Sequence, residues 1–63
     1  HIAPGATLSG GVKVGARSLV GVGATVVQYT TIGQDCMIGA GAAVIKDCIE
    51  PGTYVGVPAK KQL

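Results

Sequence analysis

The stretch Leu19–Val44, LVGVGATVVQYTTIGQDCMIGAGAAV, carries an aliphatic residue at every sixth position. The same spacing runs through most of the chain, at Ile2, Leu8, Val14, Val20, Val26, Ile32, Ile38 and Val44, and it stops at Glu50. With roughly one residue in four aliphatic, chance gives eight such positions in a row about once in tens of thousands of sequences. The spacing fits neither a helix nor an ordinary strand, so we interpret it as a structural repeat.

A period of six indicates short strands separated by turns. Each repeat supplies one strand whose aliphatic side chain points inward, and a small residue fits the corner four positions later. The residue after the aliphatic one is often Gly, which we expect to ease the bend; these are Gly15, Gly21, Gly33 and Gly39. Three sides close a triangular coil, so residues eighteen apart stack and successive coils pair as parallel strands about 4.8 Å apart. The sequence therefore predicts an all-β parallel β-helix of about 2.7 coils over residues 1–49, followed by a C-terminal cap over residues 50–63.

The composition excludes several classes of protein. A chain of 63 residues buries too little surface to be comfortably stable alone, so we expect copies of itself or further sequence beside it. A net charge of +2 is too small for a nucleic-acid surface, and polar residues interrupt the one long uncharged stretch, so we expect neither nucleic acid nor membrane as a partner. A single histidine is too few for a zinc site of several histidines, and no metal is expected. Two cysteines make no secreted disulfide framework, which favours a cytoplasmic location.

Four stretches of the chain resemble the left-handed hexapeptide-repeat family of acyltransferases. They are HIAPGATLSGGVKVG, GVGATVV, IGAGAAVIKD and VGVPAK, and they are most similar to bacterial enzymes that acylate sialic acid or nucleotide-linked amino sugars. The resemblance implies a left-handed helix, acetyl-CoA as co-substrate, a sugar or nucleotide-sugar acceptor, and a homotrimer with its active site between subunits. It also implies that a sugar-nucleotide-binding domain and the general base precede His1.

The tail Val55–Lys61, VGVPAKK, resembles the Gly-x-Pro-Ala-Lys segment that lies along the coenzyme A groove in this family. The resemblance implies that Pro58, Ala59, Lys60 and Lys61 contact the coenzyme, and two adjacent cations suit a phosphate. A pure cap over the last coil is the alternative interpretation.

The same resemblance implies that His1, Val22 and Ala40 contact acetyl-CoA. Val22 and Ala40 are eighteen residues apart, so they stack on the same side of consecutive coils. Gly10 interrupts the coil, and the resemblance implies that its backbone N–H binds the oxyanion, since Gly lets a ligand approach the backbone closely. An ordinary corner glycine is the alternative.

Cys36 and Cys48 both fall at the small corner position on different sides of the triangle, so we expect inert buried fillers. Tyr29 is expected in an exposed loop or a subunit contact, and Lys46 and Asp47 are expected to be solvated charges.

Three functions are compatible with these observations. The first is the coenzyme A-binding part of an acetyl-CoA-dependent acetyltransferase that acylates the amine of a nucleotide-linked amino sugar. The second is an O-acetyltransferase acting on sialic acid. The third is a trimerising structural β-helix without activity of its own. An ice-binding array would require threonines stacked at eighteen-residue intervals; Thr7 and Thr25 fit, but Ala43 does not.

Overall fold

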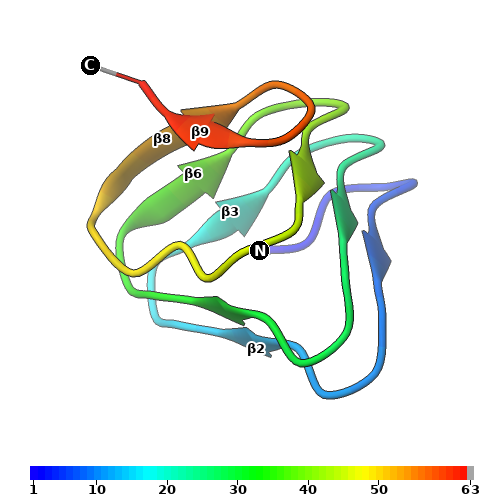
Figure 1. The fold of residues 1–63 in the computed structure, drawn as a ribbon, viewed down its shortest axis with the longest axis horizontal. Coiled ribbons are helices and arrows are strands. Elements are labelled where there is room, and N and C mark those ends of the chain that lie inside the picture. The colour runs from blue at the N-terminus through cyan, green and yellow to red at the C-terminus, as the bar shows by residue number, and fades with distance from the viewer. Residues whose placement is uncertain (63) are drawn as a thin grey trace.

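Short strands at six-residue intervals make up the computed structural model, which describes residues 1–62. The last residue of the predicted cap, Leu63, lies outside these residues. The strands are β1 Thr7–Leu8, β2 Lys13–Val14, β3 Leu19–Val20, β4 Thr25–Val26, β5 Thr31–Ile32, β6 Cys36–Ile38, β7 Ala43–Val44, β8 Gly52–Val55 and β9 Lys60–Lys61. They form three sheets, ordered β1–β4–β7, β2–β5 and β3–β6–β8–β9, and the chain winds as the predicted left-handed parallel β-helix (Figure 1). Among these residues, no helix has the length and apolar character needed to cross a membrane.

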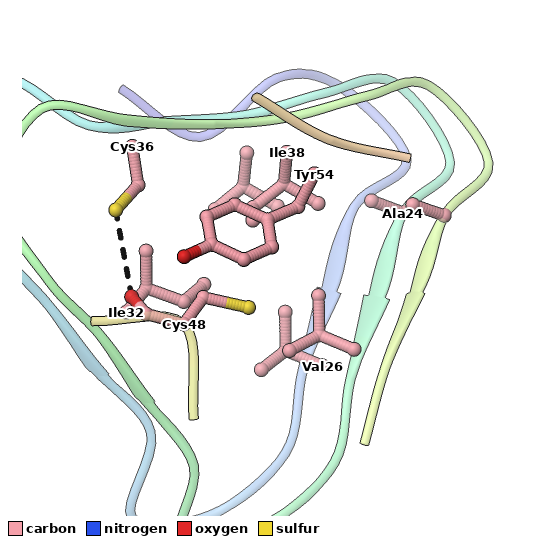
Figure 2. Close-up of a cluster of buried hydrophobic side chains, with 10 residues drawn as sticks. Ala24, Val26, Ile32, Cys36, Ile38, Cys48 and Tyr54 are labelled. Carbon is pink, nitrogen blue, oxygen red and sulfur yellow. Dashed lines mark hydrogen bonds between the residues drawn. The ribbon is translucent and has the colours of Figure 1, made fainter. Parts of the chain in front are cut away.

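The aliphatic positions of the repeat form the core, as predicted. Thr7 pairs with Thr25 and Thr25 with Ala43 in parallel, so residues eighteen apart do stack. The inward side chains of the second and third coils are at most 1% exposed; they are Val20, Val26, Ile32, Ile38 and Val44. Figure 2 shows Val26, Ile32 and Ile38 entering the core from three sides. In the first coil Ile2 and Leu8 remain 43% and 36% exposed.

The bend of each corner lies three residues after the aliphatic position. Seven successive corner residues have φ between 55° and 76°: Gly5, Gly11, Arg17, Gly23, Tyr29, Asp35 and Gly41. The prediction that the Gly directly after the aliphatic residue eases the bend is therefore wrong. At Gly21 a Cβ would lie 2.6 Å from the carbonyl oxygen of Ile38 in the next coil, so these glycines are required by close stacking.

The small residues four positions after the aliphatic one fill the inside of the corners, as predicted. Ala24 and Ala42 are buried, and Ser18 adds hydrogen bonds between coils. Its hydroxyl donates to the carbonyl oxygen of Gly33 at 2.6 Å and accepts the N–H of Cys36 at 2.9 Å. On the outside of one corner Arg17 and Asp35 form a two-point ion pair, and the hydrogen bond from the guanidinium lowers the pKa of the Asp35 carboxyl.

The third coil is two residues shorter than the others. Ile32 bridges to Cys48 and Ile38 pairs with Tyr54, both sixteen residues apart. Cys48 thus stands opposite an inward position, and its predicted place at a corner is wrong, although both cysteines are buried and on different sides as expected. In the shortened coil a side chain, Asp47, supplies the acceptor for a backbone N–H: its Oδ1 accepts the N–H of Thr31 at 2.9 Å.

A tyrosine and an antiparallel strand close the C-terminal end. The ring of Tyr54 lies among the core side chains (Figure 2), and its hydroxyl donates to the carbonyl oxygen of Glu50 at 2.8 Å. Strand β8 pairs in parallel with β6, and β9 pairs antiparallel with β8 (Figure 1). Strand β8 lies beyond the predicted boundary between residues 49 and 50, yet it pairs with β6 of the repeat segment. The division into a repeat segment and a functional tail stays a prediction.

Candidate functional site

The tail folds back along β7 and forms a groove with the residues that follow this strand. The N–H of Ala43 donates to the carbonyl oxygen of Gly56 at 3.0 Å, and the N–H of Ala59 donates to the carbonyl oxygen of Ala43 at 2.8 Å. Between them the chain turns through a cis peptide bond at Val57–Pro58. The groove has a volume of about 320 Å³ and is lined by Ile45, Lys46, Pro58, Ala59 and Lys60. This is the lower end of the range for ligand pockets, so the groove accommodates part of a large ligand.

The groove brings together two cations from distant parts of the sequence. Lys60 is one of the predicted residues, and Pro58 and Ala59 beside it are two more. Lys46 was expected to be a solvated charge; only the folding back of the tail places it in the same groove. Two ammonium groups beside Ile45 and Pro58 suit an anion that carries a flat or apolar group.

Lys61 lies apart from this groove. Neighbouring residues of a strand point to opposite faces, so Lys60 and Lys61 diverge. The Lys61 ammonium is 3.9 Å from the carboxylate of Glu50, and its side chain covers Gly52, where a Cβ would lie 2.8 Å from Lys61 Cε. The Lys61 side chain therefore lies over Gly52 beside Glu50, and its contact with a coenzyme stays a prediction.

The predicted column of Val22 and Ala40 lies at the opposite end of the β1–β4–β7 sheet from Gly10 and Lys46. Val22 and Ala40 are exposed at the corner that precedes the sheet, where the N–H of Gly41 donates to the carbonyl oxygen of Val22 at 2.9 Å. Gly10 lies at the corner that follows β1, and Lys46 follows β7 at the same end. The two corners are six residues apart, up to about 20 Å at the rise of an extended chain. Neither Val22 nor Ala40 lines the groove that contains Lys46 and Lys60.

Gly10 differs from every other glycine in the chain. Each of the others has a positive φ or a Cβ position within 3.0 Å of another atom, whereas a Cβ at Gly10 would meet no atom of residues 1–62 within 4 Å. The fold therefore does not require a glycine at position 10, which weakens the ordinary corner alternative. The backbone there is open to an approaching group, and the oxyanion role stays a prediction.

The backbone of His1 lies beside β3. Its amino group donates to the carbonyl oxygen of Ser18 at 2.8 Å, and its own carbonyl accepts the N–H of Val20 at 2.9 Å. The side chain is exposed, and its coenzyme contact stays a prediction. Within residues 1–62 no group of three or more His, Cys, Asp or Glu is placed to hold a metal ion.

Comparisons with known proteins identify a family and similar structures. A family model described as the hexapeptide repeat of succinyl-transferase matches residues 11–44 and 29–58. PerB from Caulobacter crescentus, solved with CoA and GDP-perosamine, is 45% identical with a TM-score of 0.95, covering 98% of this chain and 30% of its own. The acetyltransferase domain of PglB from Neisseria gonorrhoeae, also solved with acetyl coenzyme A, is 44% identical with the same TM-score and coverage. A maltose O-acetyltransferase from Clostridium difficile is 38% identical, with a TM-score of 0.75 over 81% of this chain and 27% of its own.

The chain thus spans less than a third of the length of the structures it matches. A comparison with curated proteins finds no significant match.

Proposed function

The chain belongs to the hexapeptide-repeat acyltransferase family, and from this premise we propose that it is the coenzyme A-binding part of an acetyl-CoA-dependent acetyltransferase. The acceptor is the amine of a nucleotide-linked amino sugar. The observation that carries the proposal is the groove between the tail and the residues after β7, which Lys46 and Lys60 both line. The similarity to PerB, whose crystal holds CoA and GDP-perosamine, supports both the coenzyme and the acceptor.

The groove fits the nucleotide end of coenzyme A. Lys46 and Lys60 bind its phosphates as point charges, and the apolar side chains of Ile45 and Pro58 pack against the adenine. The groove is too small for the whole coenzyme, so the pantetheine arm leaves it along the helix axis. Two coil spacings, about 10 Å, separate Lys46 from Gly10 in that direction.

Gly10 then lies where the thioester reacts. The acceptor amine attacks the thioester carbon, the developing oxyanion accepts the N–H of Gly10, and the thiolate leaves. The amine gives its proton to a general base that the family resemblance places before His1. The open backbone at Gly10 supports this arrangement because a side chain there would occupy the space of the reacting group.

A homotrimer is part of the proposal. Val22 and Ala40 stand at one end of the β1–β4–β7 sheet, and Gly10 and Lys46 at the other. A coenzyme that contacts both sets lies between two copies, one supplying each corner. A cytoplasmic location is also proposed; two free, buried cysteines support it.

O-acetylation is the second candidate, favoured by the similarity to a maltose O-acetyltransferase. The N-acetyl assignment rests on the higher identity and TM-score of the perosamine N-acetyltransferase. Acetyl transfer to an amino sugar and to its hydroxyl analogue, compared at equal concentration, separates the two.

Calorimetric titration with coenzyme A and with 3′-dephospho-coenzyme A tests the groove. We expect Lys46→Ala and Lys60→Ala each to weaken coenzyme A binding about tenfold, since each removes a charge-assisted contact to phosphate. Lys13→Ala is the matched control, because Lys13 is exposed on β2 in a different sheet. If the 3′-phosphate is the group bound, the losses disappear with the dephospho form. Equal affinity of all three variants and the unmutated chain would refute the proposed site.

A further inference from the structure

Tyr29 occupies a corner position where its backbone is strained. Its φ is 60°, in the left-handed region that costs a non-glycine residue roughly 1–2 kcal/mol. The other strained corners have a visible compensation, because Arg17 and Asp35 bind each other at 2.7 and 3.0 Å. The Tyr29 side chain is instead 79% exposed. A strained residue with a large exposed ring is a reason to look for a ligand contact.

The ring of Tyr29 nevertheless lies against the backbone of a neighbouring coil. It lies against the backbone of Gly11, where a Cβ would come within 2.8 Å of the ring atom Cε1. The N–H of Tyr29 also donates to the carbonyl oxygen of Gly10 at 2.9 Å. The absence of a side chain at position 11 is therefore what allows the ring to lie there.

The ring and the backbone beside it form one continuous surface, composed of Gly10, Gly11 and Tyr29. Gly10 is open to solvent, and the ring adjoins it through Gly11. The face of an aromatic ring packs against C–H groups, and a phenol hydroxyl binds neighbouring hydroxyls. A sugar ring presents both kinds of group.

We propose that Tyr29 is an acceptor-binding residue, whose ring packs against the sugar ring of the acceptor and holds its amine over Gly10. The inference rests on the proposed function, which places the reacting thioester at Gly10. The amine has to come within about 3 Å of the thioester carbon, so the amino sugar, rather than the nucleotide base, reaches this surface.

Tyrosine fluorescence gives a direct test. The chain has two tyrosines and no tryptophan, and Tyr54 is buried, so changes at the exposed ring report on Tyr29. We expect the fluorescence to change on titration with GDP-perosamine in the presence of coenzyme A, and to stay constant with GDP alone.

Two variants complete the test. Tyr29→Gly removes the ring and suits the left-handed backbone, so it folds; we expect it to weaken GDP-perosamine binding about tenfold and to leave coenzyme A binding unchanged. Tyr29→Phe retains most of the affinity because the face of the ring is preserved.

Three results would overturn the inference. They are unchanged affinity of Tyr29→Gly for GDP-perosamine, a wild-type protein that binds coenzyme A but not GDP-perosamine, and a fluorescence change with GDP equal to that with GDP-perosamine. Fluorescence that depends on protein concentration without ligand would assign Tyr29 to a subunit contact instead. If the unmutated protein does not bind coenzyme A, the proposed function itself is refuted.

Discussion

Replacing Gly21 with alanine tests how closely the coils stack. A Cβ at this position lies 2.6 Å from the carbonyl oxygen of Ile38 and 2.9 Å from the amide nitrogen of Ala40, both backbone atoms of the next coil. An ordinary carbon–oxygen contact is about 3.4 Å, so the coils have to separate by roughly 0.8 Å. The separation also stretches the 2.9 Å hydrogen bond from the N–H of Gly21 to Ile38. Overpacking costs about 1–3 kcal/mol and a weakened hydrogen bond about 1 kcal/mol, so we expect a loss of about 3 kcal/mol.

Urea unfolding followed by far-ultraviolet circular dichroism measures this loss. A chain of this size has a total stability of roughly 3–9 kcal/mol, so the variant should lose a large part of its unfolding free energy. Gly10→Ala is the matched control, because its Cβ meets open space, and we expect a change within about 0.5 kcal/mol. Both proteins are compared at one concentration, because association adds to the apparent stability. A Gly21→Ala protein as stable as the control would refute the stacking argument.

Two further substitution and labelling experiments address the shortened third coil. Asp47→Ala leaves the N–H of Thr31 without its 2.9 Å acceptor; because this hydrogen bond is exposed, we expect a loss of about 0.5–1.5 kcal/mol in the same urea titration. Asp47→Asn keeps an acceptor oxygen and should lose less; equal losses would show that the hydrogen bond contributes nothing. Burial raises the pKa of the Cys48 thiol, and Cys36 is buried beside it, so we expect both thiols to react with an aromatic disulfide reagent at least about a hundredfold more slowly in buffer than in urea. A fast phase amounting to one thiol per chain would contradict this.

The repeat was predictable because one physical requirement recurs in every coil. Each inward position needs an aliphatic side chain, and residues such as Val26 and Val44 satisfy it at a constant spacing. Glycine was harder to interpret, because two different requirements select it. Gly21 is needed for space and Gly23 for its positive φ, and a sequence letter does not distinguish them.

The third coil was predicted only in part. The end of the aliphatic series at Glu50 could be predicted from the sequence. The pairing of Ile38 with Tyr54 could not, because backbone hydrogen bonds set this register and allow a shorter loop before it. In the site, the resemblance supplied Pro58, Ala59 and Lys60, whereas Lys46 was missed because its proximity depends on the path of the tail.

The eighteen-residue coils that precede the shortened one determine how such a site can change size. Inserting one eighteen-residue repeat between Val20 and Ile38 reproduces the inward, corner and glycine positions of its neighbours, and it lengthens the shaft by about 4.8 Å. The shortened coil and the tail move together with the insertion, and so does Lys60. In the proposed site, the number of coils therefore sets the distance from Gly10 to Lys60 along the helix axis. That distance determines the length of the ligand that fits.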